Sequence, residues 1–97
     1  MEVTYYLQRY EFEWDITKAR SNLQKHGVTF EEAAEVFLDP FCQMGDASDG
    51  WEQRDFVIGY SHSQRVILTV YTERRDRIRI ISARLATRVE RKLYEEA

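Results

Sequence analysis

The second half of the chain alternates apolar and polar residues with a period of two, as half-buried β-strands do. Three segments show this alternation: Asp55–Tyr60, Arg65–Glu73 and Ile78–Ala83. Short connections at 61–64 and 74–76 separate them, so we expect an antiparallel meander. Phe41–Ala47 is a candidate fourth strand, and a polar loop follows it at 46–52.

The first half shows the 3.6-residue period of an amphipathic helix. Ile16, Ala19 and Leu23 form one apolar stripe. Asp15 precedes the stripe, and its carboxylate can accept the free backbone amides of a first helical turn. Gly27 follows it and can adopt the left-handed conformation of a helix C-cap. These signals predict a helix that begins after Asp15 and ends at Gly27.

Two capping-box patterns predict further helices. Thr29 and Glu32 form the first pattern, and Pro40 stops the helix that it opens. The apolar face of that helix would comprise Phe30, Ala33, Ala34 and Phe37. Thr87 and Glu90 form the second pattern, which opens a helix that ends near the last residue.

The order of these elements predicts one α+β domain of 97 residues. It should contain two N-terminal helices, a small antiparallel sheet of three to four strands, and a C-terminal helix. The helices would cover one face of the sheet and leave the other for solvent or a ligand. Residues 1–10 are an uncertain N-terminal extension, either a short strand or a docked arm, and residues 11–14 could form a brief extended piece.

The charges are divided unevenly along the chain, although their sum is only −3. Residues 1–53 carry 4 Lys/Arg and 11 Asp/Glu, a balance of −7. Residues 54–97 carry 10 and 6, a balance of +4, and the two balances add to −3. The acidic total argues against a simple nucleic-acid coat, but a basic second half permits one basic face. The alternative is a set of solvated surface charges.

Other features narrow the class of protein. One cysteine, Cys42, excludes an intramolecular disulfide and a cysteine-based zinc site. No apolar run is long enough to cross a bilayer, and no secretion signal is visible, so we expect a cytoplasmic protein. His26 and His62 lack partners at metal-ligand spacing, and there is no glycine-rich phosphate loop. We therefore predict no metal and no cofactor.

Arginines on the predicted strands carry the clearest chemistry. Arg77 and Arg79 fall on one strand face, and Arg65 lies on the neighbouring strand, where a hairpin could bring it close. Guanidinium groups match phosphate because they can donate two parallel hydrogen bonds. The alternative is that surface carboxylates such as Glu73 and Asp76 pair with them, which contributes little stability.

Arginines aimed at a phosphodiester would stabilise the charge that builds up when a 2′-hydroxyl attacks it, without a metal. Such a reaction also needs a proton acceptor and a proton donor. Glu52, in the loop before the sheet, and His26, at a helix end beside Lys25, are the candidates. A structural role for His26 is the competing interpretation.

Two long blocks of residues resemble the BrnT family of bacterial toxins. The first contains Phe12-Glu13-Trp14-Asp15, Lys18, Asn22, Lys25-His26-Gly27-Val28, Phe30-Glu31-Glu32-Ala33 and Val36-Phe37. The second contains Glu52, Arg54, Ile58-Gly59, Arg65, Ile78-Arg79-Ile80-Ile81-Ser82-Ala83-Arg84, Ala86-Thr87, Glu90-Arg91 and Tyr94-Glu95. The resemblance covers about residues 11–96, and residues 1–10 lie outside it.

This resemblance implies a RelE-like fold and a metal-independent endoribonuclease that inhibits translation. It also implies a cognate BrnA-like antitoxin with a ribbon-helix-helix fold, and contact with operator DNA only through that antitoxin. The matching polar positions are Lys25, His26, Glu52, Arg65, Arg79 and Arg84. Their side-chain chemistry suggests that Arg65 and Arg79 hold the phosphate, that Glu52 or His26 transfers protons, and that Lys25 positions substrate.

Two further residues are candidates for substrate binding. Arg77 shares the strand face of Arg79, and Arg84 follows on the same strand. Arg84 could instead brace the last strand against the C-terminal helix. A different function also fits the same residues: a non-catalytic module whose arginine face docks an acidic antitoxin and which acts as a co-repressor of its operon.

Overall fold

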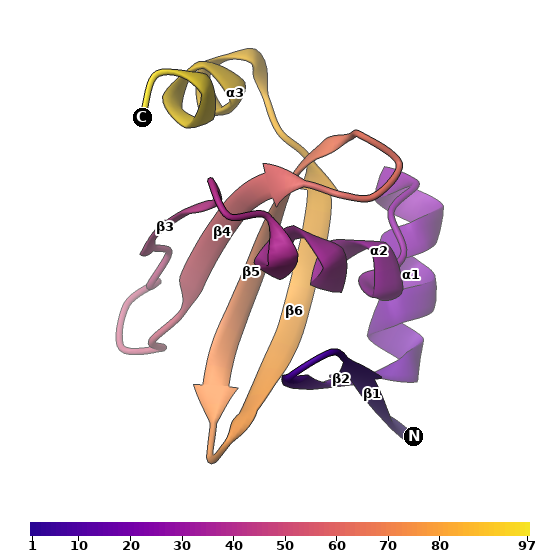
Figure 1. The fold of residues 1–97 in the computed structure, drawn as a ribbon. Helices are drawn as coiled ribbons and strands as arrows, with labels where there is room; N and C mark the ends of the chain where they lie inside the picture. Colours follow the sequence, from indigo (N-terminus) through magenta and orange to yellow (C-terminus); the bar gives the residue numbers. More distant parts are fainter.

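The computed structural model describes residues 1–97, which form one six-stranded sheet with helices around it (Figure 1). The strands are β1 (Glu2–Leu7), β2 (Tyr10–Asp15), β3 (Gln43–Asp46), β4 (Asp55–Tyr60), β5 (Val66–Arg74) and β6 (Arg77–Leu85). The helices are α1 (Ile16–His26), α2 (Phe30–Glu35), the 3-10 turn η1 (Val36–Leu38) and α3 (Arg88–Glu95). No helix is both long and apolar enough to cross a membrane.

The sheet is mixed, with the strand order β1-β2-β6-β5-β4-β3. All neighbouring strands are antiparallel except β2 and β6, which run parallel where Phe12 pairs with Ile78 and Glu13 with Arg79. The first and last thirds of the chain therefore meet in the middle of the sheet. The short connections β4–β5 and β5–β6 were predicted correctly, as were the bounds of β4.

The helix ends follow the predicted capping signals. Asp15 accepts a hydrogen bond from the Lys18 backbone N–H at 3.0 Å, and Gly27 ends α1 with a φ of 68°. At α3 the capping box is complete, because the Thr87 and Glu90 side chains each accept from the other's backbone N–H. Such caps satisfy backbone groups that a helix end leaves without partners, each contributing about 1 kcal/mol.

The main core lies between α2 and the sheet. Phe30, Ala33 and Ala34 are fully buried, as their predicted helical face requires. They pack in one cluster with Phe12 and Trp14 of β2. Burial of each large aromatic side chain contributes about 1.5–3 kcal/mol, so this cluster fixes the helix layer on one sheet face.

Asn22 fixes α1 beside β6. Beyond Arg79 the edge of β6 has no strand partner, and the buried Asn22 side chain takes that place. Its Nδ2 donates to the Ala83 carbonyl at 2.7 Å, and the Ala83 N–H donates to its Oδ1 at 3.0 Å. Nδ2 also donates to the Val28 carbonyl at 3.0 Å. At Ala83, the edge of β6 that faces away from β5 is thereby hydrogen-bonded to a helix side chain instead of to a strand.

The predicted fold class was wrong in its sheet and in its element order. A small antiparallel sheet of three to four strands after two N-terminal helices was expected, but six strands form a mixed sheet, and the β1–β2 hairpin precedes α1. The RelE-like architecture named in that prediction is not confirmed. The parallel pairing of residue 12 with residue 78 joins distant segments, so it leaves no local signal in the sequence. Of the alternatives for residues 1–10, the strand is correct.

Candidate active site

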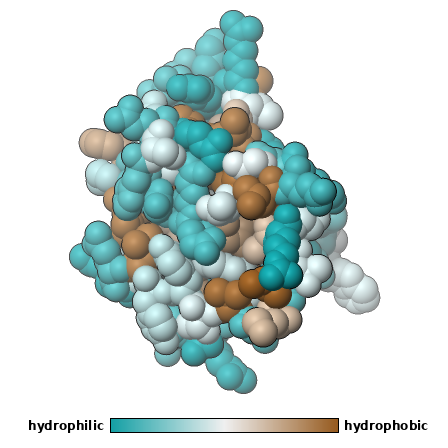
Figure 2. Space-filling model, turned by 90° about the vertical axis from the view of Figure 1, so that its right-hand side faces the viewer, coloured by the Kyte–Doolittle hydropathy of each residue, from teal (hydrophilic) through white to brown (hydrophobic).

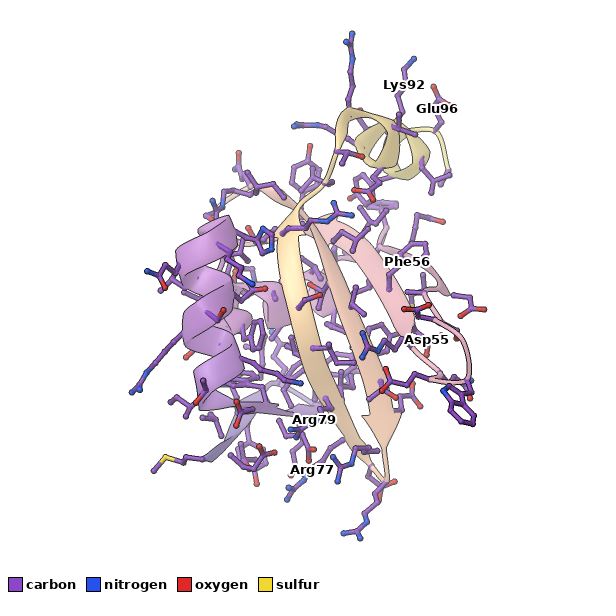
Figure 3. The ribbon with its side chains drawn as sticks, turned by 180° about the vertical axis from the view of Figure 1, so that it is seen from behind. Asp55, Phe56, Arg77, Arg79, Lys92 and Glu96 are labelled. Carbon is purple, nitrogen blue, oxygen red and sulfur yellow. The ribbon has the colours of Figure 1, made fainter.

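The sheet face opposite α2 is largely free of helices, as the view from behind shows (Figure 3). At one end of this open face, Tyr94 of α3 packs against a cluster that contains Ile58 and Leu68. At the other end lie Arg77 and Arg79, near the turn between β5 and β6. Two of the three arginines expected to lie together, Arg77 and Arg79, are therefore neighbours on this face, away from the hydrophobic core.

A hollow of about 270 Å³ opens on this face. Its lining comes from α1, the loop before β4, β5 and β6: Lys18, Glu52, Gln53, Arg54, Thr72, Arg74, Arg79 and Ile81. We call this set the arginine groove. Four side chains in it are cationic at neutral pH and one is anionic. Carboxylates outside the lining also pair with two of the cations, because Glu2 and Glu13 bind Arg79 and Glu13 lies 3.9 Å from Arg74.

A second hollow of about 200 Å³ adjoins the groove, because Lys18 and Ile81 line both. It also contains Lys25 and His26 of α1. Residues three or four positions apart share a helix face, which explains why Lys18 and Lys25 both point to this side. Four predicted site residues thus lie in two adjoining hollows: Lys25, His26, Glu52 and Arg79.

The strand register sets the arginine positions. Thr72 pairs with Arg79 and Arg74 pairs with Arg77, and directly paired residues point to the same sheet face. The turn between the strands is tight, and Arg75 there has a φ of 58°. A register shift at Val70/Tyr71 adds one residue to β6 at this point.

Arg79 is mostly buried and already has carboxylate partners. Its Nη1 donates to Glu13 Oε2 at 2.9 Å and also to Glu2 Oε1, and its Nη2 donates to Glu2 Oε2 at 3.2 Å. These hydrogen bonds raise the pKa of Arg79 further above its usual value. Beside it, Arg77 binds Glu11 and lies 3.6 Å from Glu13.

Glu52 lies at the mouth of the arginine groove. Its side chain is 63% exposed, and its Oε2 accepts a hydrogen bond from Arg54 Nη2 at 2.5 Å. Asp49 and Glu52 also exchange two backbone hydrogen bonds, of 3.2 and 3.1 Å, which hold the loop in place. A carboxylate on an ordered loop beside cationic side chains is placed to accept a proton from a bound ligand.

Arg65 lies outside the arginine groove. Its Nε donates to Glu32 Oε2 at 2.9 Å and its Nη2 to the Gly27 carbonyl at 3.0 Å. Glu32 also accepts from Ser61 at 2.8 Å and Ser63 at 2.7 Å, and the Arg65 hydrogen bonds lower its pKa to about 2. Glu32 was expected to complete a capping box at Thr29, but its carboxylate binds Arg65 instead.

The expected proximity of Arg65 and Arg79 was wrong. Residues of a hairpin meet when they are equally far from its turn, and Arg79 therefore pairs with Thr72. Arg65 lies seven residues before Thr72, which is roughly 23 Å along a strand. The prediction that β5 and β6 are neighbouring strands was correct, but the prediction that Arg65 and Arg79 lie close together on them was not.

Arg84 binds Glu90 through two hydrogen bonds, of 2.7 Å from Nη1 and 2.9 Å from Nη2. This pairing lowers the pKa of Glu90 to about 2. Glu90 is at the same time the capping-box residue of α3. Arg84 therefore ties β6 to the C-terminal helix, as the alternative interpretation of this residue anticipated.

Comparisons with known proteins identify the family to which the chain belongs. Residues 14–90 match the model of a family described as the ribonuclease toxin BrnT of a type II toxin-antitoxin system. The chain belongs to the BrnT family. Its fold is similar to the crystal structure of the ribonuclease toxin BrnT of Brucella abortus, with a TM-score of 0.59 and 25% identity, over 77% of this chain and 94% of that chain. No curated protein matches the chain.

All residues of the arginine groove fall inside the segment that matches the BrnT family model. The carboxylates that pair with Arg77 and Arg79 do not, because Glu2, Glu11 and Glu13 precede residue 14. The residues that line the groove thus belong to the family segment. The carboxylates that pair with Arg77 and Arg79 come from residues that precede this segment in the sequence.

Three groove residues were missed by the sequence analysis as site residues: Lys18, Arg54 and Arg74. A signal existed for Lys18, because it lies seven residues from Lys25 on one helix face. Arg54 lies two residues after Glu52, and Arg74 two residues after Thr72. These spacings became informative only once the groove was known.

Proposed function

We propose that the arginine groove binds a phosphodiester of RNA and that the protein cleaves it through the neighbouring 2′-hydroxyl, without a metal ion. The observation that carries the proposal is the gathering of Lys18, Arg54, Arg74 and Arg79 around one carboxylate, inside the BrnT family segment. Arginines can supply the positive charge that the transition state of phosphate transfer needs.

In this reaction the 2′-oxygen forms a bond to phosphorus and the bond to the 5′-oxygen breaks. The 2′-proton passes to Glu52, and the 5′-oxygen takes a proton as it leaves. Arg79 binds the phosphate oxygens, and Arg54 holds the Glu52 carboxylate in place. The products carry a 2′,3′-cyclic phosphate and a 5′-hydroxyl.

His26 and Lys25 serve the adjoining hollow in this proposal. His26 provides the proton for the leaving 5′-oxygen, and Lys25 binds the next phosphate along the chain. Lys18 lines both hollows, so the RNA backbone can pass from one to the other along α1. Arg65 has no part in the chemistry, since its guanidinium is engaged by Glu32 and Gly27.

The partner in this proposal is a BrnA-like ribbon-helix-helix antitoxin that covers the groove. RNA cleavage would inhibit translation in the cytoplasm until the antitoxin binds, and operator DNA would be contacted by the antitoxin alone. A cationic groove suits an acidic segment of such a partner. Expression without the antitoxin should arrest growth, whereas a non-catalytic co-repressor would leave growth unchanged.

Cleavage of a defined RNA in EDTA tests the enzymatic proposal. The folded protein should release fragments with 2′,3′-cyclic phosphate or 3′-phosphate ends, and Glu52→Gln should lower the rate about 10²–10⁴-fold. Glu31→Gln is the matched control, because Glu31 is exposed on α2 and forms no ion pair. Intact RNA after incubation with stoichiometric folded protein would refute the proposal.

A further inference from the structure

Trp51 is the most exposed large apolar residue of the chain. Its side chain is 100% exposed, whereas Trp14, the other tryptophan, is 2% exposed and lies in the core. Tryptophan is normally well buried in folded proteins, since it carries a large apolar surface. Trp51 therefore contributes nothing to packing in the isolated chain, and its position needs another explanation.

The backbone holds Trp51 at a defined place. Asp49 and Glu52 exchange two backbone hydrogen bonds, so Gly50 and Trp51 are the two central residues of a tight turn. Gly50 has a φ of 64°, which suits such a turn. Trp51 thus lies on the turn that carries Glu52, the next residue along the chain, and Glu52 lines the arginine groove. Trp51 itself is not among the lining residues, so its exposed ring lies outside the groove.

We propose that Trp51 stacks on a base of single-stranded RNA whose phosphate lies in the arginine groove. This inference rests on the proposed function. Proteins that bind single strands combine a cationic groove for the backbone with exposed aromatic rings for the bases. The structure supplies a cationic groove and, on the same loop as the groove residues Glu52 and Arg54, an exposed indole. A base inside a duplex cannot be reached in this way, so the substrate class is an unpaired RNA segment.

The affinity for a 2′-O-methyl oligouridine tests this stacking, because such an RNA cannot be cleaved through its 2′-position. Trp51→Ala should weaken binding about tenfold, and Trp51→Phe should weaken it less because a ring remains. A chain of the same length without bases serves as the matched probe. Wild type and Trp51→Ala should bind that abasic chain equally.

Fluorescence gives a second reading of the same contact. Only Trp51 is exposed, so RNA should quench the wild-type emission, and Trp51→Phe, which keeps only the buried Trp14, should show no quenching. Equal affinity of wild type and Trp51→Ala for the oligouridine would overturn the inference. Failure of RNA cleavage would leave this binding result unaffected, so the two proposals can fail separately.

A different observation concerns β1. Glu2 places both carboxylate oxygens on the two Arg79 nitrogens, which is how an arginine also grips a phosphate. Glu2 is 58% exposed, β1 is an edge strand, and the strand precedes the family segment. The geometry points to β1 as a built-in competitor that RNA must displace from Arg79, an inference that also rests on the proposed function.

Glu2→Gln tests this competition, because it removes the charge and keeps the shape. The substitution should tighten binding of the 2′-O-methyl oligouridine about three- to tenfold, as expected when a larger fraction of the protein has a free site. Glu31→Gln should leave the affinity unchanged. Unchanged or weaker binding of the oligouridine by Glu2→Gln, with thermal unfolding confirming an intact fold, would overturn the inference that β1 competes with RNA. This measurement does not depend on cleavage activity.

Discussion

Arg65 and Arg79 are both held by carboxylates, yet their surroundings differ. Arg65 pairs with Glu32, whose side chain is only 16% exposed and is also bound by two serines. Arg79 pairs with Glu13, which is 13% exposed, and also with Glu2, which is 58% exposed on an edge strand. A carboxylate enclosed by several donors is costly to uncover, whereas an exposed one can exchange with solvent or a ligand.

This difference separates two uses of the same side chain. Arg65 joins the loop before β5 to α2 and to the end of α1, so it stabilises the fold. Arg79 lines an open groove, where an anion could reach it by displacing the exposed Glu2. The number of hydrogen bonds does not distinguish the two arginines, but the exposure of one Arg79 partner, Glu2, does.

Among the arginine substitutions, Arg79→Ala should give the largest effect on activity. Loss of a positioned donor to the transition state lowers the rate about 10²–10³-fold. The free energy of unfolding should change by less than about 1 kcal/mol, because Glu13 keeps Arg74 at 3.9 Å and Arg77 at 3.6 Å. Single-turnover RNA cleavage and thermal unfolding measure the two quantities, and an unchanged cleavage rate would remove Arg79 from the site.

Arg65→Ala should lower the stability of the fold and have little effect on RNA cleavage. It leaves the Glu32 carboxylate half-buried with only Ser61 and Ser63 as donors, so we expect a loss of about 2–3 kcal/mol of stability. Cleavage by the folded fraction should stay within a few-fold of wild type. Urea unfolding gives the stability, and a cleavage rate as low as that of Arg79→Ala would return Arg65 to the catalytic site.

The contribution of the Arg65–Glu32 pair to the free energy of unfolding should decrease at low pH. Arg65 lowers the pKa of Glu32 from 4.5 to about 2, so the folded state binds this proton less readily than the unfolded chain. The stabilisation is complete above about pH 4.5 and is lost as the pH falls towards 2. Between pH 6 and pH 3, wild type should lose about 1–2 kcal/mol more than Glu32→Gln. Parallel pH curves for the two proteins would contradict this.

Arg77→Ala should give the smallest effects. Its ion pair with Glu11 is exposed, at 43% and 30% for the two side chains, so the thermal unfolding temperature should hardly change. Arg77 does not line the arginine groove, and we expect RNA affinity to fall only two- to threefold through weaker long-range attraction. A loss as large as that of Arg79→Ala would extend the site to this arginine.

Local signals explain which parts of the fold were predictable. The caps at Asp15, Thr29 and Thr87 depend on neighbouring residues, and so does the tight turn around Arg75. Glu52, His26 and Lys25 could also be named as candidate residues from the sequence, because the acid–base chemistry or charge of a side chain follows from its residue type. None of these features needs a contact between distant segments.

Distant contacts were decided only by the tertiary structure. The sequence by itself determined the helices, the β4–β5–β6 meander and a basic face on it. The parallel pairing of β2 with β6, the edge contact of Asn22 with Ala83, and the different partners of Arg65 and Arg79 depend on where distant segments meet. The physical reason is that the residue type alone sets the charge and shape of a side chain, whereas packing and strand register determine which distant residues it contacts.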